Sequence, residues 1–253
     1  MLGSIAIACG LLQAPVRAAS PAPAAANAAV VPALVERAAT AFATELEGVI
    51  GMQRHFTTVI KAGPIKHTET SESGVLFNNG AFVKMKYYSI ADDGKAFAAD
   101  KLASREKQAN TDSATGKIYF REPYDRRFFA DYQYSQPQAC TGCAPGLMIV
   151  NFTSSVKDDQ HGNGKMWIES GGARVMQLVY TPNALPQHAT SGTVTETSSQ
   201  VTPALWYVSR IDQMYRGHVA IMTGTGEFNG VLDHFQRFAS LAQGEAALAD
   251  GSI

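Results

Sequence analysis

The sequence predicts an α+β domain in which one N-terminal helix precedes an antiparallel sheet. Two observations support this class: apolar residues at helical spacing follow Pro32, and short alternating apolar stretches separated by turn residues begin at Val75. Antiparallel strands can be joined by tight turns, whereas parallel strands need long crossover connections. A series of short strands at this spacing therefore favours a meandering antiparallel sheet.

The predicted helix is long and covers residues 32–51. Pro32 suits the first helical position because its missing N–H group has no intrahelical partner there. Apolar side chains follow at steps of three and four, which places them on one face: Val35, Ala38, Phe42, Leu46 and Val49. Gly51 is expected to end the helix.

A β-hairpin is predicted over residues 75–90. Asn78, Asn79 and Gly80 interrupt its alternating pattern, and Asn-Gly is typical of a two-residue hairpin turn. Ala81, Val83, Met85 and Tyr87 are expected on one face, and Phe82, Lys84, Lys86 and Tyr88 on the other.

The later segments are mostly strand-like. Residues 95–108 predict a helix or a loop, and the aromatic residues 117–134 predict strand broken at Pro123. Residues 165–169 and 174–180 predict a second hairpin, since a Gly-rich stretch joins them. Further strands are expected at residues 192–201, 204–212 and 218–223, and residues 231–241 fit either a strand or a short helix.

The N-terminal residues predict export from the cytoplasm. The apolar run 2–12 has signal-peptide length, and Val16-Arg17-Ala18 offers small residues for cleavage after Ala18, with Ala28 as a second position. The alternatives are a cytosolic protein with an Ala/Pro-rich tail, or a lipid anchor on Cys9. We expect residues 1–31 to be signal peptide and linker, 32–243 to be a single domain, and 244–253 to be a C-terminal tail.

Charge and hydropathy exclude two classes of partner. Lys and Arg number 21 and Asp and Glu 22, which gives a net charge of -1. Such a chain lacks the basic excess that nucleic acids or an anionic membrane surface require. No stretch after the N-terminal run reaches the length of a transmembrane segment.

Cys140 and Cys143 form the sharpest local motif. In an oxidising compartment two thiols at this spacing favour a disulfide that closes a short loop. A redox pair would instead need its first cysteine at a helix N-terminus, whereas Pro145-Gly146 predicts a turn. A metal site is the third alternative, although no second cysteine pair completes it.

Other polar motifs are better explained as turns. Asp158, Asp159 and His161 precede Gly162, so they are turn residues that could also ligate a metal or act as acid and base. The sequence supplies no matched partner for His188 or His218. The small-residue segments 191–192 and 224–226 lack the flanking residues of a nucleophile elbow or a phosphate loop.

Late segments resemble a known superfamily. Residues 164–169 and 174–178, together with 203–206 and 235–238, are similar to the late hairpins of LolA-type lipoprotein carriers, and the order of elements matches over 33–238. The resemblance implies an incomplete, strongly curved β-barrel with the long N-terminal helix packed on its concave side. Carriers of this type hold a helical lid with an Arg on an early strand, for which Lys86 is the nearest candidate. The Cys140/Cys143 insertion and residues 157–163 depart from the pattern.

These observations lead to a functional expectation. We expect a periplasmic, noncatalytic binding protein that holds a lipid, a lipoprotein acyl chain or another hydrophobic ligand, without cofactor or metal. Envelope proteins are possible partners, and an interaction or assembly module without a ligand is the alternative. A redox or hydrolytic enzyme is a third class. Six apolar residues are expected to line the cavity: Phe42, Leu46, Val83, Met85, Tyr87 and Tyr132.

Overall fold

The computed structural model describes residues 31–116, 120–219 and 222–253. The expected signal peptide, both cleavage positions and Cys9 lie outside these residues. Within them, no helix is both long and apolar enough to span a membrane.

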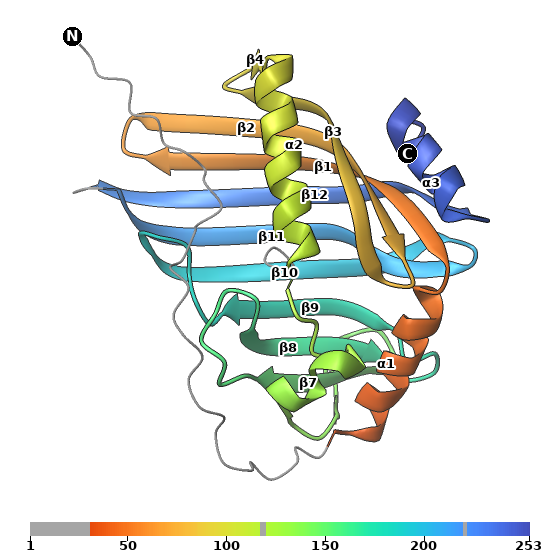
Figure 1. Cartoon of the computed structure of the whole chain (residues 1–253). Helices are drawn as coiled ribbons and strands as arrows, with labels where there is room; N and C mark the ends of the chain where they lie inside the picture. The colour runs from red at the N-terminus through yellow and green to blue at the C-terminus, as the bar shows by residue number, and fades with distance from the viewer. Residues whose placement is uncertain (1–30, 117–119, 220–221) are drawn as a thin grey trace, which may run out of the picture.

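A single antiparallel sheet of twelve strands forms the body of the protein (Figure 1). Its strands follow the order β4-β3-β2-β1-β12-β11-β10-β9-β8-β7-β5, and β6 also pairs with β7. The sheet curls toward one side, and its two edges, β4 and β5, do not meet, so it is an incomplete barrel. The strands are β1 (Val49–Ala62), β2 (Ile65–Asn78), β3 (Ala81–Asp92), β4 (Lys95–Ala96), β5 (Gln133–Tyr134), β6 (Gln138–Ala139), β7 (Leu147–Thr153), β8 (Gly162–Glu169), β9 (Val175–Pro182), β10 (Ala189–Thr202), β11 (Leu205–Val219) and β12 (Met222–Phe238).

Helices cover the two faces of the sheet unequally. On the concave face lie α1 (Ala33–Glu45), α2 (Ala99–Ala114) and the 3₁₀ helix η1 (Arg126–Asp131), while α3 (Leu241–Asp250) lies on the opposite face (Figure 1). Neighbouring residues of β2 show this division. Val75 packs with Ala109 of α2, whereas Leu76 packs with Leu248 of α3. Successive side chains of a strand point to opposite faces, so β2 contributes to two cores.

The predicted long N-terminal helix is wrong in length. The observed α1 has 13 residues and ends at Glu45, six residues before the expected end. Gly48 takes a φ of +81°, and its N–H donates to Asn79 Oδ1 at 2.7 Å, which turns the chain into β1. Val49 and Ile50 then pair with β2 and β12, since β-branched residues fit a pleated sheet well.

The hairpin at residues 75–90 is confirmed, but its predicted faces are partly wrong. Asn79 and Gly80 have φ values of +49° and +72°, as the predicted Asn-Gly turn requires. A bulge leaves Val83 as an extra residue between the paired positions of β3. Val83 therefore packs in the α3 cluster, whereas Met85 and Tyr87 pack in the cluster under α2.

Most later strands are confirmed. Residues 165–169 and 174–180 correspond to β8 and β9. Residues 192–201 lie within β10, and all of 204–212 except Ala204 lie within β11. Residues 99–108 of the predicted helix or loop are helical. The predicted strand 218–223 is not separate, because residues 218–219 end β11 and residues 222–223 begin β12. Of the segment 231–241, residues 231–238 extend β12 and the helix α3 begins only at Leu241.

Of the described part of the predicted strand segment 117–134, only Gln133–Tyr134 form a strand, β5. Residues 126–131 fold as η1 because the Asp125 carboxylate accepts a hydrogen bond from the Arg127 N–H at 2.9 Å. Its aromatic side chains nevertheless enter the core, and Tyr132 is almost fully buried. In this segment the aromatic residues indicate packing in the core and not a strand.

Residues 244–253, which were expected to be a tail, pack onto the sheet. Leu248 and Ile253 are buried against Val49 and Leu76. Lys86 donates to the Ala249 carbonyl oxygen, and this contact also holds the end of α3. The single domain of residues 32–243 stays a prediction.

Candidate ligand-binding cleft beneath α1

The helix α1 covers the concave face of β7 to β10 with a narrow apolar stripe. Val35 and Ala38 are buried in the core formed by these strands, and Leu34 and Phe42 pack at its border. The Phe42 ring meets the Tyr124 ring edge-on, with centroids 5.0 Å apart. A helix of 13 residues with two small alanines on its buried side makes a modest apolar seal.

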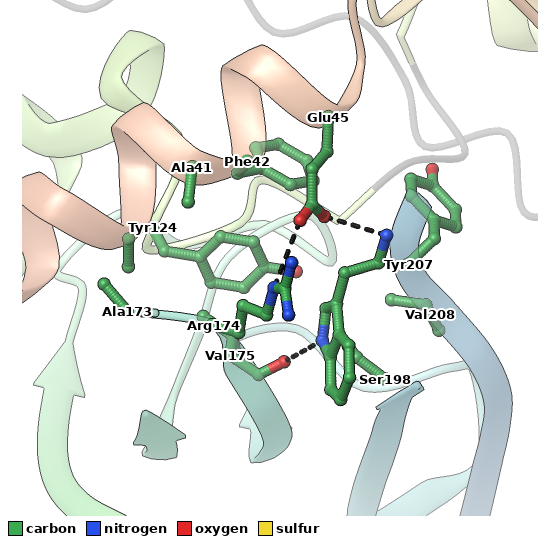
Figure 2. A pocket seen from close by; sticks show the side chains of 12 residues that line it. Ala41, Phe42, Glu45, Tyr124, Ala173, Arg174, Val175, Ser198, Tyr207 and Val208 are labelled. Carbon is green, nitrogen blue, oxygen red and sulfur yellow. Dashed lines mark hydrogen bonds and ion pairs between the residues drawn. The ribbon is translucent and has the colours of Figure 1, made fainter. Parts of the chain in front are cut away.

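Polar contacts fasten the C-terminal end of α1. The Glu45 carboxylate accepts from Arg174 Nε at 3.3 Å and from the Trp206 backbone N–H at 3.1 Å (Figure 2). The Arg174 guanidinium also lies 5.3 Å from the Trp206 ring. Arg237 donates to the carbonyl oxygens of Glu45 and Glu47 at 2.6 and 2.5 Å. These bonds satisfy carbonyl groups that a helix end leaves without an intrahelical partner.

Exposed polar contacts hold the other part of α1. Arg37 donates to the carbonyl oxygens of Ser170 and, at 3.3 Å, Gly171 in the β8–β9 turn. Arg126 of η1 pairs with Glu36 at 3.3 Å, with side chains 65% and 47% exposed. An ion pair this exposed contributes roughly 0–1 kcal/mol. Water can therefore replace these rim contacts, while Val35, Ala38 and Phe42 supply the apolar packing of the helix.

A small cavity lies beneath α1 and meets an open groove. The enclosed part has a volume of about 20 Å³, enough for about one water molecule. The adjoining groove has a volume of about 540 Å³. Ala41, Glu45, Ala173 and Arg174 line both, so the Glu45–Arg174 pair stands where they join. Figure 2 shows Phe42, Tyr124, Val175 and Tyr207 around the enclosed part.

Burial raises the pKa of the Glu45 carboxyl, while the Arg174 charge and the Trp206 N–H partly offset that rise. The carboxylate therefore depends on its partners to stay ionised under the helix. Loss of Arg174 would remove both a tether and the charge that favours ionisation.

Two buried carboxyl groups lie deeper in the same core. Glu196 of β10 accepts a hydrogen bond from the Tyr180 hydroxyl at 3.1 Å. Burial raises the pKa of Glu196 to about 6 and, together with the neighbouring Glu196 charge, raises the pKa of Glu122 well above its usual value. Two carboxylates this close cannot both ionise easily, so the pair retains a proton. Tyr124 links them to the cleft, since its ring touches Phe42 and its hydroxyl contacts Glu122.

Solved structures with a similar architecture were found. A DUF1329 family protein from Desulfovibrio piger matches with 10% identity and a TM-score of 0.44, covering 87% of this chain and 97% of that one. An outer membrane lipoprotein-sorting protein domain from Vibrio parahaemolyticus matches with 13% identity and a TM-score of 0.44, covering 86% and 97%. A LolA superfamily protein from Nitrosomonas europaea matches with 8% identity and a TM-score of 0.36, covering 83% and 94%.

The chain resembles these three structures in architecture only. No protein-family model and no curated protein matches the sequence. Because the TM-scores of these three structures are below 0.5, we infer function from the residues of this chain alone.

The structure brings only some of the expected ligand-binding residues together. Phe42 lines the cleft beneath α1, and Tyr132 lies in the same core. Leu46, Met85 and Tyr87 belong to the second cluster, under α2. Val83 lies on the opposite face, under α3. Lys86, the candidate for holding the lid, contacts α3 and not α1.

The remaining candidate motifs have local partners. Cys140 and Cys143 form a disulfide in the turn between β6 and β7, where no helix begins. His161 is 1% exposed, and its ring nitrogens contact Asp158 at 2.7 Å and Asp131 at 3.3 Å. Asp158 also accepts from two backbone N–H groups of its own turn. These contacts support the interpretation of this segment as a turn.

The sequence analysis missed Glu45, Tyr124, Arg174 and Trp206, which shape the cleft. One signal was present. Glu45 is acidic at the C-terminal end of a helix, where the helix dipole disfavours negative charge. An acidic residue at that position indicates a partner from elsewhere in the chain, but only the fold shows that the partner is Arg174.

Proposed function

We propose that this chain is a noncatalytic binding protein of the bacterial envelope that holds an acyl chain or a similar hydrophobic ligand beneath α1. The observation that carries the proposal is the way α1 is attached. A short amphipathic helix covers an apolar concave face, and polar contacts at the rim hold its C-terminal end. Such a cover can open without unfolding the sheet below it.

The volumes of the cavity and the groove support the view that α1 closes the cleft when no ligand is bound. Pockets for small ligands measure roughly 300–1,000 Å³. The enclosed cavity of about 20 Å³ is far smaller, whereas the adjoining groove of about 540 Å³ falls in that range. Outward movement of α1 would join the two spaces. The ligand would then replace Phe42 and Ala38 as the apolar cover of the strands.

The lining residues favour an amphiphilic ligand. Arg37, Thr40 and Thr44 line the open groove beside the Glu45–Arg174 pair, whereas Ala38, Phe42 and Val175 line the enclosed part. A polar or anionic end group would lie in the groove and contact these hydrogen-bond donors. The acyl chain would extend below α1, where each buried methylene gains roughly 0.8 kcal/mol.

The expected affinity is modest. About ten buried methylenes contribute roughly 8 kcal/mol, which corresponds to micromolar binding before ordering costs are subtracted. The cost of lifting α1 lowers the observed affinity further, because only the open fraction binds. This strength suits a periplasmic carrier that receives a lipid or lipoprotein acyl chain and releases it to another envelope protein. The periplasmic location rests on the apolar run at residues 2–12.

A fluorescent long-chain fatty acid tests the proposal. We expect delipidated protein to bind the probe saturably, and Ala41→Glu to weaken binding at least tenfold by placing a charge in the cleft. Ala43→Glu is the matched control, since Ala43 is exposed on the same helix and does not line the cleft. Circular dichroism would verify that both variants keep the fold. If both variants lose affinity for the probe equally, or if neither loses affinity, the ligand binds elsewhere.

An interaction module without a ligand is the second candidate. It is favoured by the close packing of the concave face, where buried side chains of two clusters fill the space under α1 and α2. Absence of any saturable probe binding by the wild-type protein would reject the carrier function and favour this second one.

A further inference from the structure

We propose that His55, Asp233 and His234 form a binding site for a divalent transition metal, with Zn²⁺ as the best-suited ion. The site lies outside the cleft, on the opposite face of the sheet from α2. This departs from the sequence-based expectation that the chain holds no metal. None of these residues was singled out in the sequence, because they meet only when β1 pairs with β12.

The ligand atoms converge from two adjacent strands. His55 Nε2 lies 3.1 Å from Asp233 Oδ1, and His234 Nδ1 lies 2.8 Å from the same oxygen. One ligand atom from each residue lies within 4.8 Å of the other two. Tetrahedral zinc with bonds of about 2.0–2.1 Å needs ligand atoms about 3.3 Å apart. Small side-chain rotations would therefore accommodate the ion.

A bulge in β12 makes this convergence possible. Gly51 pairs with Gln236 and Gln53 with Asp233, so His234 and Phe235 together oppose Met52. Consecutive residues of a regular strand point to opposite faces. At the bulge, His234 takes a φ of +49°, and its ring meets the Asp233 carboxylate. Phe235 still reaches the core under α2. The extra residue thus supplies a second imidazole without loss of core packing.

A second carboxylate, that of Glu72, lies near the other ring nitrogen of His55. Glu72 Oε1 of β2 lies 3.8 Å from His55 Nδ1, and the Ser89 hydroxyl of β3 donates to Glu72 Oε2 at 3.2 Å. Metal-bound histidines usually direct their second ring nitrogen to a carboxylate, which fixes the orientation of the ring. With Nδ1 directed toward Glu72, Nε2 points toward Asp233, on the side where the ion would bind. The line from Ser89 through Glu72 to His55 crosses three strands.

The ligand set indicates the class of metal. Two imidazoles and one carboxylate suit Zn²⁺, Cu²⁺, Ni²⁺ or Co²⁺ better than the oxygen-seeking Mg²⁺ or Ca²⁺. His55, Asp233 and His234 have side chains 37%, 41% and 61% exposed. Water can therefore reach the ion and complete its coordination.

A second group in the protein provides a control. His67 Nδ1 lies 3.2 Å from Asp92 and 3.3 Å from Asp93. This group has one imidazole, and the Asp93 carboxylate already accepts from the Thr68 N–H at 2.7 Å. Its contacts are explained by the turn between β3 and β4, so we expect it not to supply the strong site.

Calorimetric titration of Zn²⁺ into the untagged, EDTA-treated full chain tests the proposal. We expect one equivalent to bind with an affinity that His55→Gln and His234→Gln each reduce at least tenfold. Glu72→Gln should reduce affinity about tenfold, as loss of a supporting carboxylate does elsewhere. His67→Gln should leave affinity unchanged. Circular dichroism confirms folding, and visible absorption of bound Co²⁺ gives a second readout that should disappear in His234→Gln.

Several outcomes would overturn the site. Wild-type protein that binds no Zn²⁺ would do so, as would unchanged affinity in both His55→Gln and His234→Gln. Loss of binding in His67→Gln alone would assign the ion to the turn between β3 and β4. None of these results would affect the proposed acyl-chain binding, because the cleft shares no residue with this site.

Discussion

Two regions of the sheet are closed by different means. The strands β1 to β3 carry α2 on the concave face and α3 on the other, and each helix buries apolar side chains against them. The strands β7 to β10 carry α1 and η1 on their concave face (Figure 1). Among the described residues, no helix covers their other face. Their core also contains the ionisable pair Glu122 and Glu196.

This difference shows where the protein can open. Separating α3 from the sheet would expose Leu248, Ile253 and Leu76, and truncation of one such side chain typically costs about 2–5 kcal/mol. Lifting α1 exposes Val35 and two alanines, Ala38 and Ala39, which bury less apolar area than the α3 residues. It also breaks rim contacts, of which an exposed ion pair contributes roughly 0–1 kcal/mol. Ligand entry is therefore expected at α1, and the region near α3 serves as the rigid support.

The largest expected effect concerns the packing of α3 against the sheet. Leu76→Ala should lower the free energy of unfolding by about 2–5 kcal/mol, because Leu76 is fully buried between the sheet and α3. Urea unfolding would measure the change. Ile65→Ala on the same strand is the matched control, since Ile65 is 44% exposed and should change stability by about 0.5 kcal/mol or less. Equal effects would mean that α3 does not seal this region.

The second prediction concerns the buried carboxyl pair under α1. The pKa of Glu196 is raised from 4.5 to about 6, so the folded state holds a proton that the unfolded state releases. Its contribution to stability is present below about pH 4.5 and is lost as the pH rises through about 6, a change of about 2 kcal/mol. The raised pKa of Glu122 acts in the same direction.

Glu196→Gln would isolate this effect, because glutamine keeps the hydrogen-bonding shape without the charge. We expect the loss of stability between pH 5 and pH 8 to be smaller in the variant than in the wild type, as measured by urea midpoints. Glu227→Gln is the control, since Glu227 lies on an exposed rim with Lys61. Parallel pH profiles for wild type and Glu196→Gln would show that the pair does not hold the extra proton.

The smallest effect concerns the rim of α1. Arg174→Ala removes the Glu45 ion pair and the contact with Trp206, so α1 should open more often. We expect faster hydrogen exchange across residues 33–45 and up to about fivefold tighter apparent binding of the fatty-acid probe, which corresponds to about 1 kcal/mol. Arg210→Ala removes an exposed ion pair with Asp212 away from α1 and should change neither measurement. Slower exchange or weaker binding would indicate that Arg174 contacts the ligand directly.

The sequence by itself determined the elements whose signals are local. The Asn79-Gly80 turn, the hairpin joined by residues 170–173 and the existence of a helix after Pro32 all follow from nearby residues. The disulfide between Cys140 and Cys143 is also local, because the two cysteines are three residues apart. The strands β1 and β7 were missed, since β1 follows the helix without a break in apolar pattern.

Only the tertiary structure decided which residues meet across the sheet. Glu45 and Arg174 are 129 residues apart, and His55 and Asp233 are 178 residues apart. Their contacts depend on strand order and on bulges at Val83 and His234, each of which changes the face that a side chain occupies. A one-residue shift reverses a strand's faces, so alternation alone cannot assign a residue to the cleft or to the opposite surface.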